Sequence, residues 1–239
     1  DAPKANPSKQ MVSEEDVNEV IDKLKRAKNP FIIVGGSGWS SEAAENLGKF
    51  AKSMGIPVGT SFRCQDYLDN RHPNYVGDVG IGINPALLKR IKLADCVLVL
   101  NARLGEMTTG GYSMFDIPKT TQYLIHVHPD PNELGSVYQP DIGLVCNSAE
   151  FIKKAVNNSK EHQNKSPIKE RANYQAWQKP LTTPGNVKMQ VVIKKLSNIL
   201  PEETIITNGA GNYNGWLHRY FTYKGWRTQV GSTSGSMGY

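Results

Sequence analysis

Hydrophobic positions along the chain follow two periods, one typical of helices and one typical of buried strands. Between Val17 and Leu24, apolar residues recur at spacings of three and four, which predicts a helix with one buried face. Continuous apolar runs follow, and the strongest, at 96–102, predicts a fully buried strand. The same patterns predict further strands at 31–34, 57–61, 123–128 and 144–146, further helices at 41–54 and 85–92, and long loops at 62–83 and 103–121.

Strands and helices that alternate in this way predict βαβ units, and therefore a mostly parallel sheet covered by helices on both faces. We place this α/β domain at residues 13–157, after a linker at 1–12 that is rich in Pro, Lys and Asn. Residues 158–186 are polar and contain several prolines, so we interpret them as an interdomain linker with one short helix near 170–178.

A second α/β unit is predicted at residues 187–239. Its first helix carries apolar residues on one face between Met189 and Ile199. A strand at 204–207 and a helix near 214–222 follow. The alternation of helix and strand is again that of a βαβ protein.

Composition and charge narrow the possible partners. The net charge of +6 and the sequence pI of about 9.1 raise the question of nucleic acid binding. Much of the positive charge lies between Lys153 and Lys179, in a stretch that predicts a solvated helix end and linker, and no nucleic-acid-binding motif accompanies it. The longest apolar runs, at 31–34 and 96–100, are far too short to span a membrane. The three cysteines form no CxxC pair and fit a reducing cytoplasm, so we expect a cytoplasmic protein with neither nucleic acid nor membrane as partner.

His126 and His128 are the histidines whose spacing could serve a metal site. They alternate on the predicted strand at 123–128, so both side chains point to one face of the sheet. Protein zinc sites need at least one more ligand, and none is evident nearby. We therefore predict no metal ligand in this chain.

Three predicted strand ends carry residues suited to a nucleotide, because parallel sheets bind ligands at the carboxyl ends of their strands. The turn at 35–38 (Gly35, Gly36, Ser37 and Gly38) could hold a phosphate on its backbone N–H groups, or could simply be a tight turn. Arg103, followed by Leu104, could pair with a phosphate or stabilise its own loop. Asp130 could accept from a ribose hydroxyl or cap a helix that begins near Asn132.

A fourth glycine-rich turn, Asn208–Asn212, follows the predicted strand of the second unit. Its glycines allow the backbone to approach a diphosphate closely, and Asn212 and Asn214 add side-chain donors. The alternative is an ordinary turn between a strand and a helix.

The order of these segments resembles that of the thiamine-diphosphate-dependent enzymes of the acetolactate synthase type. The earlier segments are similar to the family's central domain, and the later ones to the start of its pyrophosphate-binding domain. In chain order they are Asn29–Gly38, Met54–Val58, Asp95–Gly105, His126–Gly135, Thr207–Asn212 with Trp216, and Thr233–Tyr239.

The resemblance implies a Rossmann-like three-layer α/β/α central domain with a six-stranded, mostly parallel sheet, followed by the incomplete start of a second α/β domain. It also implies cofactor-binding residues. Those that match contacts to the cofactor's diphosphate are Ala210, Gly211, Asn212 and Tyr213, and those that match positions beside its thiazolium and aminopyrimidine rings are Gly235, Ser236 and Met237. Some family members carry FAD on the central domain, often with an aspartate pair after the position of Leu104, where this chain has Gly105 and Glu106. FAD, an ADP-type nucleotide and an empty cleft therefore all stay open.

The implied function is that of a carboligase or decarboxylase which acts on 2-keto acids such as pyruvate, with thiamine diphosphate and Mg²⁺ as cofactors. In the family the active site lies between two subunits, so a homo-oligomer, dimer or tetramer, is implied. The family's catalytic glutamate belongs to an N-terminal domain, and its Mg²⁺-binding loop would follow Tyr239. We therefore expect this chain to be a piece that contains no catalytic residue and is inactive alone. The alternatives are a non-catalytic FAD- or ADP-binding module and one chain of a split enzyme.

Overall fold

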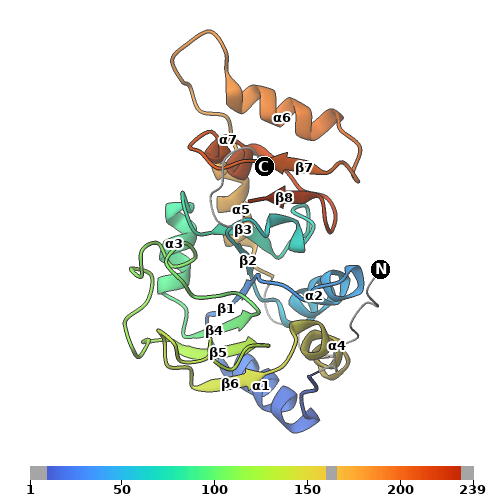
Figure 1. Ribbon diagram of the computed structural model, residues 1–239, viewed down its shortest axis with the longest axis vertical. Coiled ribbons are helices and arrows are strands. Elements are labelled where there is room, and N and C mark those ends of the chain that lie inside the picture. The colour runs from blue at the N-terminus through green and yellow to red at the C-terminus, as the bar shows by residue number, and fades with distance from the viewer. Residues whose placement is uncertain (1–9, 160–165, 233–239) are drawn as a thin grey trace, which may run out of the picture.

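The computed structural model describes residues 10–159 and 166–232. A six-stranded parallel sheet forms the larger part, with helices on both faces, and a smaller unit follows it along the chain (Figure 1). The strand order is β3-β2-β1-β4-β5-β6, and every neighbouring pair is parallel. The strands are β1 Pro30–Val34, β2 Val58–Ser61, β3 Tyr75–Val79, β4 Cys96–Leu100, β5 Tyr123–His128 and β6 Ile142–Val145. The predicted three-layer α/β/α architecture with six strands is confirmed.

Two apolar layers hold the helices to the sheet. One layer joins α1, α2 and α4 to alternate strand residues such as Ile32 and Val34. The other joins α3 to the opposite residues, Phe31 and Ile33. A fifth helix, α5, packs against α3 and the edge strand β3. The bounds are α1 Glu14–Arg26, α2 Ser41–Met54, α3 Pro85–Lys92, α4 Ser148–Asn158 and α5 Ile168–Trp177.

Local signals in the sequence fix the ends of α1 and α2. Ser13 caps α1 by accepting a hydrogen bond from the Asp16 N–H, and Ser40 caps α2 in the same way. Helix α2 ends at Gly55, whose φ of 64° is the left-handed conformation that glycine adopts without a steric penalty. The apolar face predicted between Val17 and Leu24 is buried in α1.

The prediction of a loop throughout 62–83 is wrong, because β3 lies within it. This strand contains Gly77 and Asp78, two residue types that strands disfavour, and its pairing with β2 is irregular between Val58 and Thr60. Burial of Tyr75, Val76 and Val79 and hydrogen bonds to β2 and from Arg171, which donates to the carbonyl oxygen of Tyr75 at 2.9 Å, stabilise it in spite of these two residues. The helix expected near Asn132 is also absent, since residues 131–135 form turns.

The smaller unit lies beyond α5 and consists of α6 Met189–Ile199, β7 Ile206–Asn208, α7 Asn214–Tyr220 and β8 Gln229–Gly231. Strands β7 and β8 are parallel, and the sequence patterns had indicated no strand at β8. A loop of the central sheet holds this unit in place. Asn70 exchanges hydrogen bonds with the backbone of Tyr223, and Asp66 accepts from the N–H groups of Thr228 and Gln229.

Candidate functional site

The strand order reverses between β1 and β4, which is where open α/β sheets usually bind ligands. The side chain of Asn101, directly after β4, fills this point and is 1% exposed. Its Nδ2 donates to the Ser37 carbonyl oxygen at 2.6 Å, and its Oδ1 accepts from the backbone N–H and the hydroxyl of Ser148 at 3.1 and 2.6 Å. One side chain thus joins the glycine turn after β1 to the start of α4.

The glycines at 35–38 are packed against the chain itself. A Cβ on Gly35 would collide with the Ser61 hydroxyl, one on Gly36 with the Asn101 carbonyl oxygen, and one on Gly38 with the Asn147 amide. The turn's carbonyl groups are also engaged, since the Trp39 indole donates to Gly35 at 2.8 Å and the Tyr67 hydroxyl donates to Gly36. These contacts give the glycines a structural role that needs no ligand.

Arg103 and Asp130 lie on neighbouring loops, but each has a protein partner. Arg103 is 78% exposed and donates from Nε to the Glu133 carboxylate at 2.9 Å. Asp130 accepts from the backbone N–H and the amide of Asn132, so it caps a turn and not the helix that we expected. Leu104 is buried in the second apolar layer. The structure therefore does not gather these residues with 35–38 into one open cleft.

We expect Asn101→Ala to lower the free energy of unfolding by about 2 to 3 kcal/mol, because the variant loses three hydrogen bonds in a buried place. Residue 101 also has a φ of 54°, and alanine tolerates this conformation less well than asparagine, which lowers the free energy of unfolding further. Urea denaturation followed by tryptophan fluorescence measures the change. Asn157→Ala, on the exposed face of α4, is the control, and equal stability of the two variants would contradict the role of Asn101.

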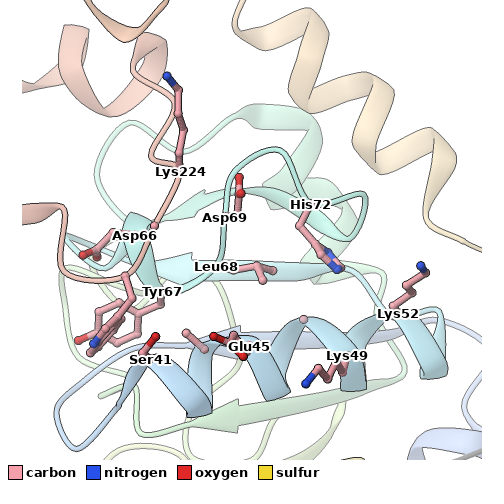
Figure 2. A pocket seen from close by; sticks show the side chains of 14 residues that line it. Ser41, Glu45, Lys49, Lys52, Asp66, Tyr67, Leu68, Asp69, His72 and Lys224 are labelled. Atoms are coloured by element: carbon pink, nitrogen blue, oxygen red, sulfur yellow. The ribbon is translucent and has the colours of Figure 1, made fainter. Parts of the chain in front are cut away.

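Two surface clefts lie beside this edge of the sheet. One, of about 600 Å³, separates the starts of α2 and α4, and Gly38 is the one predicted nucleotide residue among the described residues that line it. The other, of about 450 Å³, lies between α2 and the loop around Leu68 (Figure 2). Figure 2 shows Lys224 extending away from α2, so the charged groups of this groove do not converge on a common point. Neither cleft assembles the predicted residues.

The smaller unit does bring predicted segments together. Asn208 at the end of β7 pairs in register with Gly231 at the end of β8, so the carboxyl ends of both strands lie at one edge. The diphosphate-binding candidates, Ala210, Gly211, Asn212 and Tyr213, follow β7 directly at this edge. Gly235, Ser236 and Met237, which come after β8, lie outside the described residues. We call the described part of this place, residues 208–214 with Ser232, the β7–β8 edge.

Several buried polar atoms at the β7–β8 edge have no hydrogen-bond partner among the residues that the structure describes. The side-chain amides of Asn208 and Asn214 both donate to the Gly209 carbonyl oxygen, which leaves their own Oδ1 atoms buried and unpaired. The hydroxyl of Ser232 is likewise buried and has no partner among the described residues. Since buried polar groups in folded proteins nearly always have partners, this cluster fits a polar ligand.

Tyr213 explains why the turn contains glycine. A Cβ on Gly211 would lie 2.8 Å from the Tyr213 ring, and one on Gly209 would lie 2.9 Å from its hydroxyl. The ring lies against the turn, and Tyr213 as a residue is 58% exposed to solvent. A diphosphate that approaches the turn from this side would meet the tyrosine first.

Sequence reasoning did not find Arg63, which also reaches the β7–β8 edge. It follows β2, and its side chain lies against Gly231. His218 is nearby, with its ring edge-on to Phe62 at 5.2 Å, and burial lowers the pKa of His218 to about 4, with the Arg63 charge adding to the effect. These residues have no distinguishing sequence pattern, because only the fold brings them to the second unit.

Metal ligands and membrane spans are both missing from the described part of the chain. No three His, Cys, Asp or Glu side chains come close enough there to hold a metal ion. His126 and His128 do lie together, with ring centroids 5.7 Å apart, but His126 Nε2 lies 3.0 Å from the Ala102 carbonyl oxygen. None of the described helices is both long and apolar enough to cross a bilayer.

Comparison with known proteins decides the family. Residues 17–155, more than half of the chain, match the model of the thiamine pyrophosphate enzyme central domain. The chain belongs to the thiamine-pyrophosphate-dependent enzymes. The resemblance that the sequence motifs suggested is therefore confirmed, and the six-stranded sheet is the central domain of this family.

Curated relatives are similar over almost the whole chain. A probable acetolactate synthase of Oryza sativa is 25% identical over 93% of this chain. A probable acetolactate synthase large subunit of Methanococcus aeolicus is 26% identical over 93% of it, and the sulfoacetaldehyde acetyltransferase of Castellaniella defragrans is 27% identical over 90%. The chain spans 35%, 40% and 41% of the lengths of these three proteins.

Proposed function

We propose that the chain is part of a thiamine-diphosphate-dependent enzyme that acts on 2-keto acids such as pyruvate, as an acetolactate-synthase-like carboligase or decarboxylase. The observation that carries the proposal is the β7–β8 edge, where a glycine turn and unpaired buried polar atoms meet at the ends of two parallel strands. Relatives named as acetolactate synthases and as a sulfoacetaldehyde acetyltransferase support this class of reaction.

The residues at the β7–β8 edge fit the diphosphate of the cofactor. Backbone N–H groups of Ala210, Gly211 and Asn212 and the hydroxyl of Ser232 would donate to its oxygens, whereas the unpaired Oδ1 of Asn208 is an acceptor and would need a donor or a cation beside it. When bound, thiamine diphosphate supplies an electron sink for the carbanion that decarboxylation of a 2-keto acid leaves behind. We propose Mg²⁺ as the accompanying ion, and a cytoplasmic homo-oligomer, dimer or tetramer, as the assembly.

A flavin or ADP-type nucleotide fits the central domain less well. The free faces of Gly35, Gly36 and Gly38 are occupied by Ser61, Asn101 and Asn147. A diphosphate at this turn would have to displace these groups, of which Asn101 joins the turn to the start of α4 and Asn147 caps α4. We therefore assign no step of the reaction to a nucleotide on the central domain.

Calorimetric titration of the full chain with thiamine diphosphate and Mg²⁺ tests the proposed function. We expect weak, saturable binding, no binding of thiamine without its diphosphate, and no turnover of pyruvate by this chain alone. Asn212→Asp places a negative charge at the proposed diphosphate site and should weaken binding by about tenfold or more. Asn198→Asp, on the exposed side of α6, is the matched control. Equal binding of thiamine and thiamine diphosphate, or none of either, would contradict the proposal.

A further inference from the structure

Arg63 extends from the central domain to the β7–β8 edge. It comes two residues after the last residue of β2, Ser61. A Cβ placed on Gly231 would lie 3.4 Å from Arg63 Cδ and 3.4 Å from Asn208 Oδ1. The aliphatic part of the arginine therefore lies against the end of β8, beside the unpaired amide oxygen at the end of β7.

The positive charge of Arg63 is not neutralised within the described part of the chain. Its Nε is buried without a hydrogen-bond partner, and none of the ion pairs among the described residues includes it. Its guanidinium lies 4.8 Å from the ring of its own neighbour, Phe62. Burial lowers the pKa of the neighbouring His218 to about 4, and an imidazole offers no negative group in any case. A buried, unpaired guanidinium nitrogen is costly, which indicates a partner that is not among the described residues.

The backbone conformation of Arg63 also bears on this question. Its φ of 64° is left-handed, a conformation that glycine or asparagine would adopt at lower cost. Strained positions of this kind gather at ligand sites, where the side chain is needed in one orientation. Arg227 shares this conformation away from the β7–β8 edge, so the unpaired Nε of Arg63 carries the inference and its backbone only adds to it.

We propose that Arg63 is a ligand-binding residue that receives an oxyanion at the β7–β8 edge, an inference that rests on the proposed function. A guanidinium suits this task because its N–H groups match the oxygens of phosphate and carboxylate groups. The oxyanion has two possible sources, the diphosphate of the cofactor and the carboxylate of the 2-keto acid. Arg63 thus makes the central domain a direct contributor to the ligand site of the second unit.

Two arginines of the chain allow a matched experiment. Arg63→Gly removes the guanidinium and keeps a residue suited to the left-handed backbone. Arg227→Gly is the control, because Arg227 has a φ of 60°, is exposed, and precedes the amino end of β8, opposite the carboxyl end where Gly231 lies. The full chain of each variant is titrated calorimetrically with inorganic pyrophosphate, thiamine diphosphate and pyruvate, after thermal denaturation has shown that it is folded.

We expect Arg63→Gly to weaken binding of one anion by about tenfold or more, Arg63→Lys to weaken it less, and Arg227→Gly to leave it unchanged. Weaker binding of pyrophosphate and thiamine diphosphate assigns Arg63 to the diphosphate, and weaker binding of pyruvate alone assigns it to the substrate carboxylate. Unchanged binding of all three, or no binding of any to the wild type, overturns the inference. Arg63-dependent binding of pyrophosphate without binding of thiamine diphosphate would overturn the proposed function and leave the anion site standing.

Discussion

Gly36→Ala is expected to lower the free energy of unfolding by about 4 kcal/mol or more, a large part of the stability of a typical domain. Gly36 has a φ of 69°, which costs alanine free energy by itself. In addition, the new Cβ would overlap the carbonyl oxygen of Asn101. This oxygen belongs to the backbone, so no change of side-chain rotamer can relieve the clash. The turn would have to move away from β4, and the Asn101 hydrogen bond to Ser37 would break.

Gly105→Ala is the control for this experiment. Gly105 is in the loop after β4, has no positive φ, and has no atom within 4 Å of the position of a new Cβ. We expect its free energy of unfolding to stay within about 0.5 kcal/mol of the wild type. Urea denaturation followed by tryptophan fluorescence compares the variants. A Gly36→Ala protein as stable as Gly105→Ala would show that β1 and β4 do not approach as closely as the structure has them.

The central sheet could largely be predicted from the sequence, because its inner strands are continuous apolar runs. Strands β1, β4 and β5 are buried on both faces, so hydrophobicity alone marks them. The edge strand β3 was missed because Gly77 and Asp78 interrupt its apolar pattern, although Tyr75, Val76 and Val79 are buried in the core. The strand β8 was missed because it is only three residues long, and its partner β7 and the contact with Asp66 come from distant parts of the chain.

The candidate site was predictable only in part. Glycine turns after strands mark possible ligand sites, and the turn after β7 does lie at an edge with unpaired polar atoms. The similar turn after β1 is filled by Asn101 and Asn147, which no sequence pattern could show because both come from other strands and loops. The role that we propose for Arg63 rests on its unpaired Nε, and whether a group has a partner can be seen only in the folded chain.

Asp66 joins the central domain to the second unit, and we expect this contact to be sensitive to pH. It is 3% exposed, and its Oδ2 accepts from the N–H groups of Thr228 and Gln229 at 3.0 and 3.1 Å, while its Oδ1 is buried without a partner. Burial raises the pKa of the Asp66 carboxyl from 3.8 to about 6, and the hydrogen bonds from the backbone offset only part of this increase. The ionised carboxylate is therefore less favourable in the folded protein than in the unfolded chain.

Because the folded pKa is the higher one, the folded state holds the proton more tightly, and the contribution of Asp66 to stability falls as the pH rises from about 4 to about 6. The shift of about two pKa units corresponds to about 3 kcal/mol. His126 and His218 act in the opposite direction over a similar range, since burial lowers the pKa of each to about 4. The wild type alone therefore cannot reveal the effect of Asp66, and a comparison with a variant is needed.

Asp66→Asn isolates this effect, because asparagine keeps an acceptor for the two N–H groups and cannot ionise. We expect its free energy of unfolding, relative to the wild type, to rise by about 3 kcal/mol between about pH 4 and about pH 8. Urea denaturation at a series of pH values gives this difference directly. Asp116→Asn, in an exposed loop, should show no such trend. A difference between Asp66→Asn and the wild type that stays constant with pH would mean that the Asp66 carboxyl keeps an ordinary pKa, and hence that the contact between the two units is open to water.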